Sequence, residues 1–378
     1  MKILQVVPYF TPKRGGDFNA CFNLSKQLAR HDHEVTVLTT DFELDDESRR
    51  LIENEGVTLI PFHCAANIGS FLISPLIGHW LKKNIRNFDV VHLNNFRSYQ
   101  NIIACHFAKK YHIPYILQPD NSVPRVIQNK KQKLLFDLVF GGKILRNAHR
   151  IIAISKQEAE IIKQMGINER KIEMIYLGMD APSIMDLPSG RFKDKYGISG
   201  RMLLYLGRLN KTKGLEYVIM AFSILSQSID DLTLVIAGPD DGYLRPLERL
   251  VEDLRLGNRI IFTGFITEEE KKYAFVDADL FVHTVLYMGG VGLAPLEAVL
   301  YGTPVIVTEE CGEIVKLARC GCITPYGDLP SLIKTMKLAL ENPQHMEQLV
   351  LNGKHYIQQN LTWEKVALQV ESQYNRLL

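Results

Sequence analysis

Short apolar runs alternate with longer amphipathic or loop segments through the first half of the chain. Each run has the length and the content of β-branched and aromatic residues that are typical of a buried strand. The runs are Ile3–Val7, Val35–Thr39, Val57–Pro61, Val90–Leu93, Tyr115–Gln118, Ile151–Ile154 and Glu173–Tyr176. Strands that alternate with helical segments predict a parallel sheet with helices on both faces.

A second series of the same kind follows after residue 200. Its expected strands are Leu203–Leu206, Leu232–Ala237, Ile260–Thr263, Leu280–His283 and Pro304–Thr308. The segment between the two series is rich in Gly and Pro, which favours a connection rather than a core element. A chain of 378 residues also exceeds the usual size of one core. The pattern therefore predicts two doubly wound, Rossmann-like α/β domains, at 1–182 and 201–360, joined by a linker at 183–200.

Local signals mark where some of the helices begin. Ser155–Glu158 and Thr267–Glu270 have the spacing of capping boxes directly after a strand. An amphipathic helix is expected at Asn19–Arg30, shortly after the glycine pair Gly15–Gly16. A glycine turn at a helix N-terminus can meet an anion, although the same pair is equally consistent with a plain turn.

The composition is that of an ordinary globular protein. The chain is 46% hydrophobic and 23% charged, and its net charge of +2 argues against nucleic acid as the main partner. The longest apolar run, Ile68–Leu81, is interrupted by polar residues and is shorter than the ~20 residues of a membrane-spanning helix. The six cysteines form no C-x-x-C pair, and no signal sequence opens the chain. We therefore expect free thiols in a cytoplasmic protein rather than disulfides or a zinc site.

Two motifs in the second half of the chain carry the candidate chemistry. GRLNKTKG at 207–214 places Arg208 and Lys213 just past a strand, and two cations can neutralise a diphosphate. GGVGLAPLEA at 289–298 combines a glycine-rich turn, a helix start and the carboxylate of Glu297, which can accept hydrogen bonds from ribose hydroxyls. Ligands of doubly wound sheets bind at the carboxyl ends of the strands. A nucleotide diphosphate is therefore expected in a cleft that both domains face.

Four segments together resemble a known family. They are GGDFNACFNLSKQLARHDHEVTVLTT, GRLNKTKG, GVGLAPLEAVLYGTPVIVT and the closing LTWEKVALQVESQYNRLL. The chain is similar in these segments to the retaining glycosyltransferases of family 4, which have the GT-B fold. The resemblance implies that the final helix, at 361–378, packs on the N-terminal, acceptor-side domain, while 201–360 binds the nucleotide sugar.

The resemblance also implies roles for single residues. Arg208 and Lys213 would bind the donor diphosphate and stabilise it as it leaves, and Glu297 would hold the ribose. The glycine loop that includes Gly16 would approach the diphosphate and the acceptor, and the main chain near Ile266 would meet the base. The main chain of four further residues would contact phosphate and sugar: Gly290, Val291, Gly292 and Leu293.

Two positions depart from the family pattern. Gly289 stands where members have the first of two glutamates spaced eight residues apart, and that acid contacts the transferred sugar. Asp120 follows a strand at the place where members usually show a histidine that helps to hold the sugar. We expect Asp120 to take this place in the catalytic site, accepting a hydrogen bond from a sugar hydroxyl where histidine would donate one. Asn94, where a histidine is also common, is treated as neutral.

The implied reaction is a retaining, metal-independent transfer of a hexose from an NDP-sugar. The nucleotide sugar would be a substrate, so no cofactor is expected. The acceptor would be a glycolipid or a precursor of a cell-envelope polysaccharide. Gly289 and Asp120 favour one alternative, a non-catalytic partner subunit that still binds nucleotide. A second alternative is a sugar-nucleotide epimerase with the GT-B fold.

A basic segment at 129–150 adds a second functional signal. Residues 81–150 carry 13 Lys or Arg and 3 Asp or Glu, and the predicted helix combines many of these cations with an apolar stripe. Such a helix can lie on an anionic bilayer, which would place the protein at the inner face of the cell membrane. An ordinary surface helix, with its apolar stripe against the sheet and its lysines in water, gives the same pattern.

Overall fold

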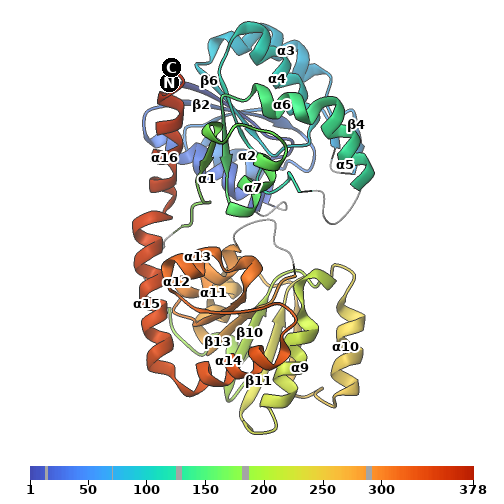
Figure 1. The fold of residues 1–378 in the computed structure, drawn as a ribbon, viewed down its shortest axis with the longest axis vertical. Coiled ribbons are helices and arrows are strands. Elements are labelled where there is room, and N and C mark those ends of the chain that lie inside the picture. Colours follow the sequence, from blue (N-terminus) through green and yellow to red (C-terminus); the bar gives the residue numbers. More distant parts are fainter. Residues whose placement is uncertain (13–15, 70, 125–129, 181–186, 287–291) are drawn as a thin grey trace. The chain divides into compact units, whose positions relative to one another are not determined.

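The computed structural model describes residues 1–12, 16–69, 71–124, 130–180, 187–286 and 292–378 (Figure 1). The chain divides into two compact units. Unit 1 comprises Met1–Gly178 and Leu361–Leu378, and unit 2 comprises Met179–Asn360.

Unit 1 is built on a seven-stranded parallel sheet with the strand order β3-β2-β1-β6-β7-β8-β9. The strands are β1 (Lys2–Val6), β2 (Glu34–Thr40), β3 (Thr58–Phe62), β6 (Val90–Asn94), β7 (Tyr115–Gln118), β8 (Arg150–Ala153) and β9 (Ile172–Met174). Alternate residues of β1 belong to different cores: Leu4 and Val6 to one cluster, Ile3 to the other. The sheet is therefore buried on both faces, which explains why its strands are continuous apolar runs.

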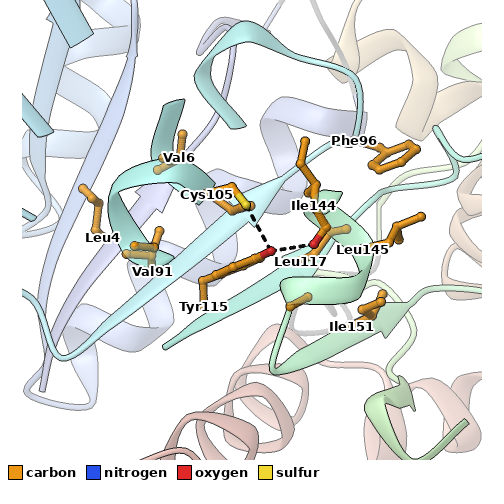
Figure 2. Close-up of a cluster of buried hydrophobic side chains, with 14 of the residues drawn as sticks. Leu4, Val6, Val91, Phe96, Cys105, Tyr115, Leu117, Ile144, Leu145 and Ile151 are labelled. Atoms are coloured by element: carbon orange, nitrogen blue, oxygen red, sulfur yellow. Dashed lines mark hydrogen bonds between the residues drawn. The ribbon is translucent and has the colours of Figure 1, made fainter. Parts of the chain in front are cut away.

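Helices cover both faces of this sheet. They are α1 (Gly16–Arg30), α2 (Asp46–Glu53), α3 (Leu76–Asn84), α4 (Tyr99–Tyr111), α5 (Lys130–Phe136), a π-helix (Asp137–Gly141), α6 (Gly142–Asn147), α7 (Lys156–Gln164) and α16 (Trp363–Asn375). Figure 2 shows the core on one face, where the Tyr115 hydroxyl donates to the carbonyl of Ile144 and lies 3.3 Å from the Cys105 sulfur. On the other face α16 packs on α1, and the buried Tyr374 hydroxyl lies 2.6 Å from His92 Nδ1.

Unit 2 contains a six-stranded parallel sheet with the order β12-β11-β10-β13-β14-β15. Its strands are β10 (Arg201–Leu206), β11 (Leu232–Ala237), β12 (Ile260–Gly264), β13 (Leu280–His283), β14 (Val305–Thr308) and β15 (Cys322–Thr324). Its helices are α8 (Arg191–Tyr196), α9 (Leu215–Leu225), α10 (Leu244–Asp253), α11 (Glu268–Asp277), α12 (Leu293–Leu300), α13 (Glu313–Ala318), α14 (Leu329–Glu341) and α15 (Pro343–Asn360).

The α/β class with two parallel sheets is confirmed, and every expected strand is present within two residues of its expected bounds. Three short strands were not expected: β15 and the antiparallel hairpin of β4 (Ala66–Ile68) and β5 (Phe71–Ile73). Three residues are too few to show a periodicity of two, so these strands leave no clear pattern in the sequence.

Part of the segment expected as a linker folds into unit 2. Helix α8 lies within residues 183–200, and the buried carboxylate of Asp277 accepts hydrogen bonds from the N–H groups of Phe192 and Lys193 at 2.7 and 3.0 Å. Glycines flank this helix at both ends, and the Gly and Pro content therefore reflected helix caps as well as a connection.

The two expected capping boxes differ in the structure. Thr267–Glu270 forms both reciprocal hydrogen bonds at the start of α11. At the start of α7, Ser155 accepts from the N–H of Glu158, but the Glu158 carboxylate accepts from the N–H of Ile154 at 3.2 Å. The prediction of a full capping box is therefore wrong here, because the N–H of Ile154 and not that of Ser155 donates to the Glu158 carboxylate.

Candidate active site

The order of the strands in unit 2 places the two sequence motifs at one edge of its sheet. From β10 the chain runs outward through β11 and β12, then returns to β13 on the other side of β10. Such a reversal in a parallel sheet leaves a crevice at the carboxyl ends of the two central strands. Arg208 and Lys213 follow β10, whereas Leu293 and Glu297 lie on α12, which follows β13. Both motifs therefore start from neighbouring strand ends.

Residues 207–214, which we call the clamp loop, are held by the ends of the neighbouring strands. The N–H of Leu209 donates to the carbonyl of Pro239 at 2.9 Å, beyond the end of β11. On the other side, Thr284 Oγ1 donates to the carbonyls of Lys213 and Gly214 at 3.1 and 3.0 Å. The N–H of Leu286 donates to the carbonyl of Thr212 at 2.9 Å. These hydrogen bonds fix the backbone that carries both cations.

The clamp loop concentrates positive charge at the strand ends. The Arg208 side chain is 70% exposed, and its guanidinium lies 3.4 Å from the Asp241 carboxylate. Lys213 is more buried, and desolvation together with the nearby Arg208 charge lowers the pKa of its ammonium. No carboxylate of the described residues forms an ion pair with Lys213. An incoming diphosphate would favour the charged ammonium of Lys213, because it would bring further negative charge close to both cations.

A neutral histidine lies beneath the clamp loop. His283, the last residue of β13, stacks between Tyr205 and Phe281 at ring-centroid distances of 5.6 and 5.8 Å. Burial, and to a lesser extent the charge of Lys213, lowers the pKa of His283 to about 3. The imidazole is therefore uncharged at neutral pH, and the positive charge of this region belongs to Arg208 and Lys213.

Glu297 is held by a lysine of the neighbouring helix. Lys271 Nζ lies 3.1 and 3.2 Å from the two carboxylate oxygens of Glu297, and 2.7 Å from Glu268. Lys271 lies in the first turn of α11, and the Thr267–Glu270 capping box fixes that turn. Ile266, which was expected near the base, is buried directly before this box. Ile266 thus directly precedes the N-cap of α11, and Glu297 pairs with a lysine of the same helix.

Some of the remaining predicted site residues are described by the structure and others lie outside the described residues. Gly292 is the N-cap of α12 and Leu293 its first residue, whereas Gly289, Gly290 and Val291 lie outside the described residues. Gly16 is the exposed first residue of α1, in unit 1. Gly15 also lies outside the described residues.

Asp120 lies in unit 1 with a left-handed backbone, which Asp and Asn adopt more readily than most other non-glycine residues. It follows β7, and both Asp120 and Asn121 have left-handed φ values, of 53° and 57°. One Asp120 oxygen accepts from Gln118 Nε2 at 2.8 Å. The other lies 3.4 Å from the N–H of Asn95. Two consecutive left-handed residues cost free energy that the surrounding contacts must offset, which is common in binding sites.

The carboxyl group of Glu158 lies close enough to Asp120 for their charges to interact. Its burial, followed by the Asp120 charge, raises the pKa of Glu158 to about 8, although the N–H of Ile154 lowers it in part. At neutral pH the buried group is therefore mostly protonated.

The raised pKa of Glu158 predicts a pH-dependent stability. In the unfolded chain Glu158 ionises near its ordinary value of 4.5, whereas in the folded protein it holds its proton up to about pH 8. The free energy of unfolding should therefore fall by about 1.4 kcal/mol per pH unit between these values. Glu158→Gln should remove this term and raise the melting temperature relative to the wild type at pH 8 but not at pH 4.5. Glu160→Gln, on the exposed side of the same helix, is the control, and a constant difference across pH would contradict the prediction.

Sequence reasoning missed three residues that position the predicted ones. Asp241 pairs with Arg208, Thr284 holds the clamp loop, and Lys271 holds Glu297. Each comes from another strand end or helix. These residues could have been found from their positions in the sequence, because all three come after the carboxyl end of an expected strand, where ligands of doubly wound sheets bind.

Two family models match the chain. The model for Glycosyltransferase Family 4 matches residues 14–181, and the model for Glycosyl transferases group 1 matches residues 191–356. An uncharacterised glycosyltransferase of Methanocaldococcus jannaschii is 27% identical over 66% of this chain and 64% of its own length. The chain thus spans less than two thirds of this relative. Mannosylfructose-phosphate synthase of Agrobacterium fabrum is 23% identical over 94% of this chain and 85% of its own length.

The fold agrees with these matches. The crystal structure of Anabaena HepE in complex with UDP superposes with a TM-score of 0.80 at 20% identity, covering 100% of both chains. HepE has also been solved in complex with UDP-glucose. Because the family models cover most of both units, and the named relatives are glycosyltransferases, the chain belongs to the family 4 glycosyltransferases and has the GT-B fold.

Proposed function

We propose that this glycosyltransferase moves a sugar from an NDP-sugar to a glycolipid or a cell-envelope polysaccharide precursor, with retention of anomeric configuration and without a metal ion. The observation that carries the proposal is the clamp loop. Arg208 and Lys213 follow β10, and α12 follows the neighbouring strand β13, at the switch point of the sheet. This arrangement suits a diphosphate that gains charge as it leaves.

The chemistry proposed for the site needs few protein groups. The bond between the anomeric carbon and the diphosphate oxygen breaks on the same face on which the acceptor oxygen forms its bond. The electron pair of the broken bond stays on the diphosphate, and the acceptor hydroxyl gives its proton to the β-phosphate. Arg208 and Lys213 stabilise the developing negative charge, which is the task that a divalent cation performs elsewhere. Asp120 accepts a hydrogen bond from a hydroxyl of the sugar.

The experiment that tests this function uses the purified chain and a panel of UDP-, GDP-, ADP- and dTDP-sugars. Thermal shift identifies the nucleotide, and release of free NDP with and without EDTA measures turnover. Proton NMR of the transferred sugar then reports the anomeric configuration. Transfer with inversion, or activity that EDTA abolishes, would contradict the proposal.

The same panel separates the two alternatives. A nucleotide that stabilises the protein while no donor is turned over identifies a non-catalytic partner subunit, which the glycine at position 289 favours. Conversion of one NDP-sugar into its epimer identifies a sugar-nucleotide epimerase.

We expect Lys271 to act as a positioning residue for the ribose contact of Glu297. Lys271→Met should raise the KM for the NDP-sugar by ~3–10-fold with kcat nearly unchanged, because the ribose is bound equally in ground state and transition state. Lys271→Arg should restore the KM, since the ion pair with Glu297 can form again. Glu268→Gln, which removes the other partner of Lys271, is the control. An unchanged KM, or a loss confined to kcat, would contradict this role.

A further inference from the structure

Five large apolar side chains are exposed within seven consecutive residues of unit 1. Leu134 and Leu135 on α5, and Leu138, Val139 and Phe140 on the following π-helix, are each at least 40% exposed, and Leu138 reaches 75%. We call these five residues the apolar ridge. Surface helices normally turn polar residues to water, so such a concentration marks an interaction surface. The interpretation of 129–150 as an ordinary surface helix is therefore wrong for the first half of this segment.

The hairpin of β4 and β5 belongs to the same unit and contacts α5. Figure 1 shows β4 beside α5, and the rings of Phe71 on β5 and Phe136 on α5 lie 6.1 Å apart. Ile68, at the end of β4, is 69% exposed. Ile68 pairs with Phe71 across the hairpin, so a further exposed apolar side chain lies one strand away from the contact with α5.

The apolar ridge is held in place from below. Asp137, between α5 and the rest of the π-helix, is buried and accepts two hydrogen bonds from Arg97 at 2.9 and 2.7 Å. Arg97 also donates to the carbonyl of Val123 at 2.8 Å. Phe136 packs against Phe96 with ring centroids 6.2 Å apart. The scaffold thus presents the ridge to solvent in a fixed orientation.

The charges around the ridge indicate what covers it. Lys130 and Lys131 precede it and Lys143 and Arg146 follow it, and all four side chains are exposed. The only acidic residue in 130–150 is Asp137, whose charge Arg97 neutralises. An apolar centre bordered by cations complements a bilayer with anionic headgroups. No helix of the described residues is long and apolar enough to cross that bilayer.

We propose that the apolar ridge inserts into the surface of an anionic membrane, with the neighbouring lysines on the lipid headgroups. Contact of this kind buries apolar side chains about 5–10 Å below the headgroup boundary and gains further from opposite charge. It would hold unit 1, the acceptor-side part of the chain, at the bilayer. The inference does not depend on the chemistry proposed above.

Co-sedimentation with vesicles tests the proposal without any assay of activity. The wild type should bind vesicles of phosphatidylcholine with phosphatidylglycerol more strongly than vesicles of phosphatidylcholine alone, and less strongly at high salt. Leu135→Asp together with Leu138→Asp should reduce binding by roughly tenfold or more. Lys130, Lys131 and Lys133 changed together to Glu should reduce binding only where the lipid is anionic and the salt is low.

A matched surface serves as the control. Leu338 on α14 is 49% exposed and lies beside the exposed Lys334 and Lys337. Leu338→Asp should leave vesicle binding unchanged, and the leucine variants should keep the wild-type melting temperature because these side chains are exposed. Binding by the Leu135→Asp/Leu138→Asp variant equal to that of the wild type would overturn the proposal. A wild-type dimer that this variant converts into a monomer, without vesicle binding, would assign the ridge to a second copy.

Discussion

Replacing either cation of the clamp loop is expected to abolish most of the activity. Lys213→Ala and Arg208→Ala should each lower kcat/KM by ~10²-fold or more, because each removes a preorganised charge that faces the leaving diphosphate. Steady-state kinetics with the best donor of the nucleotide-sugar panel measures the effect. Lys213→Ala should be the more damaging change, since its ammonium is the more buried of the two.

The chain offers a close control for this prediction. Lys211 lies in the same short 3₁₀ turn, but it is exposed. Lys211→Ala should therefore keep kcat/KM within a few-fold of the wild type. Near-wild-type turnover by both Arg208→Ala and Lys213→Ala would exclude the clamp, even if the protein still binds nucleotide. Equal losses for all three lysine and arginine variants would indicate only a general loss of positive charge.

The sequence was sufficient for the strands of both sheets and for the position of residues 207–214 directly after a strand, because both depend on local patterns. A buried parallel strand such as β11 is a continuous apolar run in the sequence. The loop after β10 can be recognised in the sequence by its two flanking glycines and its cations. The parallel direction of the strands follows from the alternation of strands and helices, whereas the strand order comes from the structure alone. The contact of Lys271 with Glu297 joins residues 26 positions apart on different helices, and no local pattern predicts it.

Exposure was the property that the sequence could not supply at the apolar ridge. An apolar stripe on a helix predicts burial against the sheet, and this is correct for Ile144 and Leu145 on α6. The π-helix between α5 and α6 widens one turn and so changes the direction in which the preceding side chains point. The same stripe is therefore buried at its end and exposed at its beginning, as Leu138 shows.

Glycine at position 238 is expected to be indispensable for the geometry of the clamp loop. Gly238 follows β11 with a φ of +139°, and an added Cβ would lie 2.0 Å from the carbonyl oxygen of Gly207, where the clamp loop begins. The backbone of both glycines is held by the sheet. The N–H of Gly207 donates to the carbonyl of Ala237 at 3.0 Å, and the N–H of Gly238 donates to the carbonyl of Gly264 at 2.8 Å. An alanine can be accommodated only if the ends of β10 and β11 move apart.

Gly238→Ala should therefore lower the free energy of unfolding by ~3 kcal/mol or more and weaken NDP binding, since Gly207 precedes Arg208. Gly242 is the matched control: its φ is +85°, but an added Cβ meets no atom within 4 Å. Gly242→Ala carries only the backbone strain of a left-handed alanine, about 1 kcal/mol, and should leave NDP affinity unchanged. Thermal unfolding and NDP titration of both variants separate steric contact from backbone strain. Equal melting temperatures for the two variants would show that the approach of Gly207 and Gly238 does not limit this site.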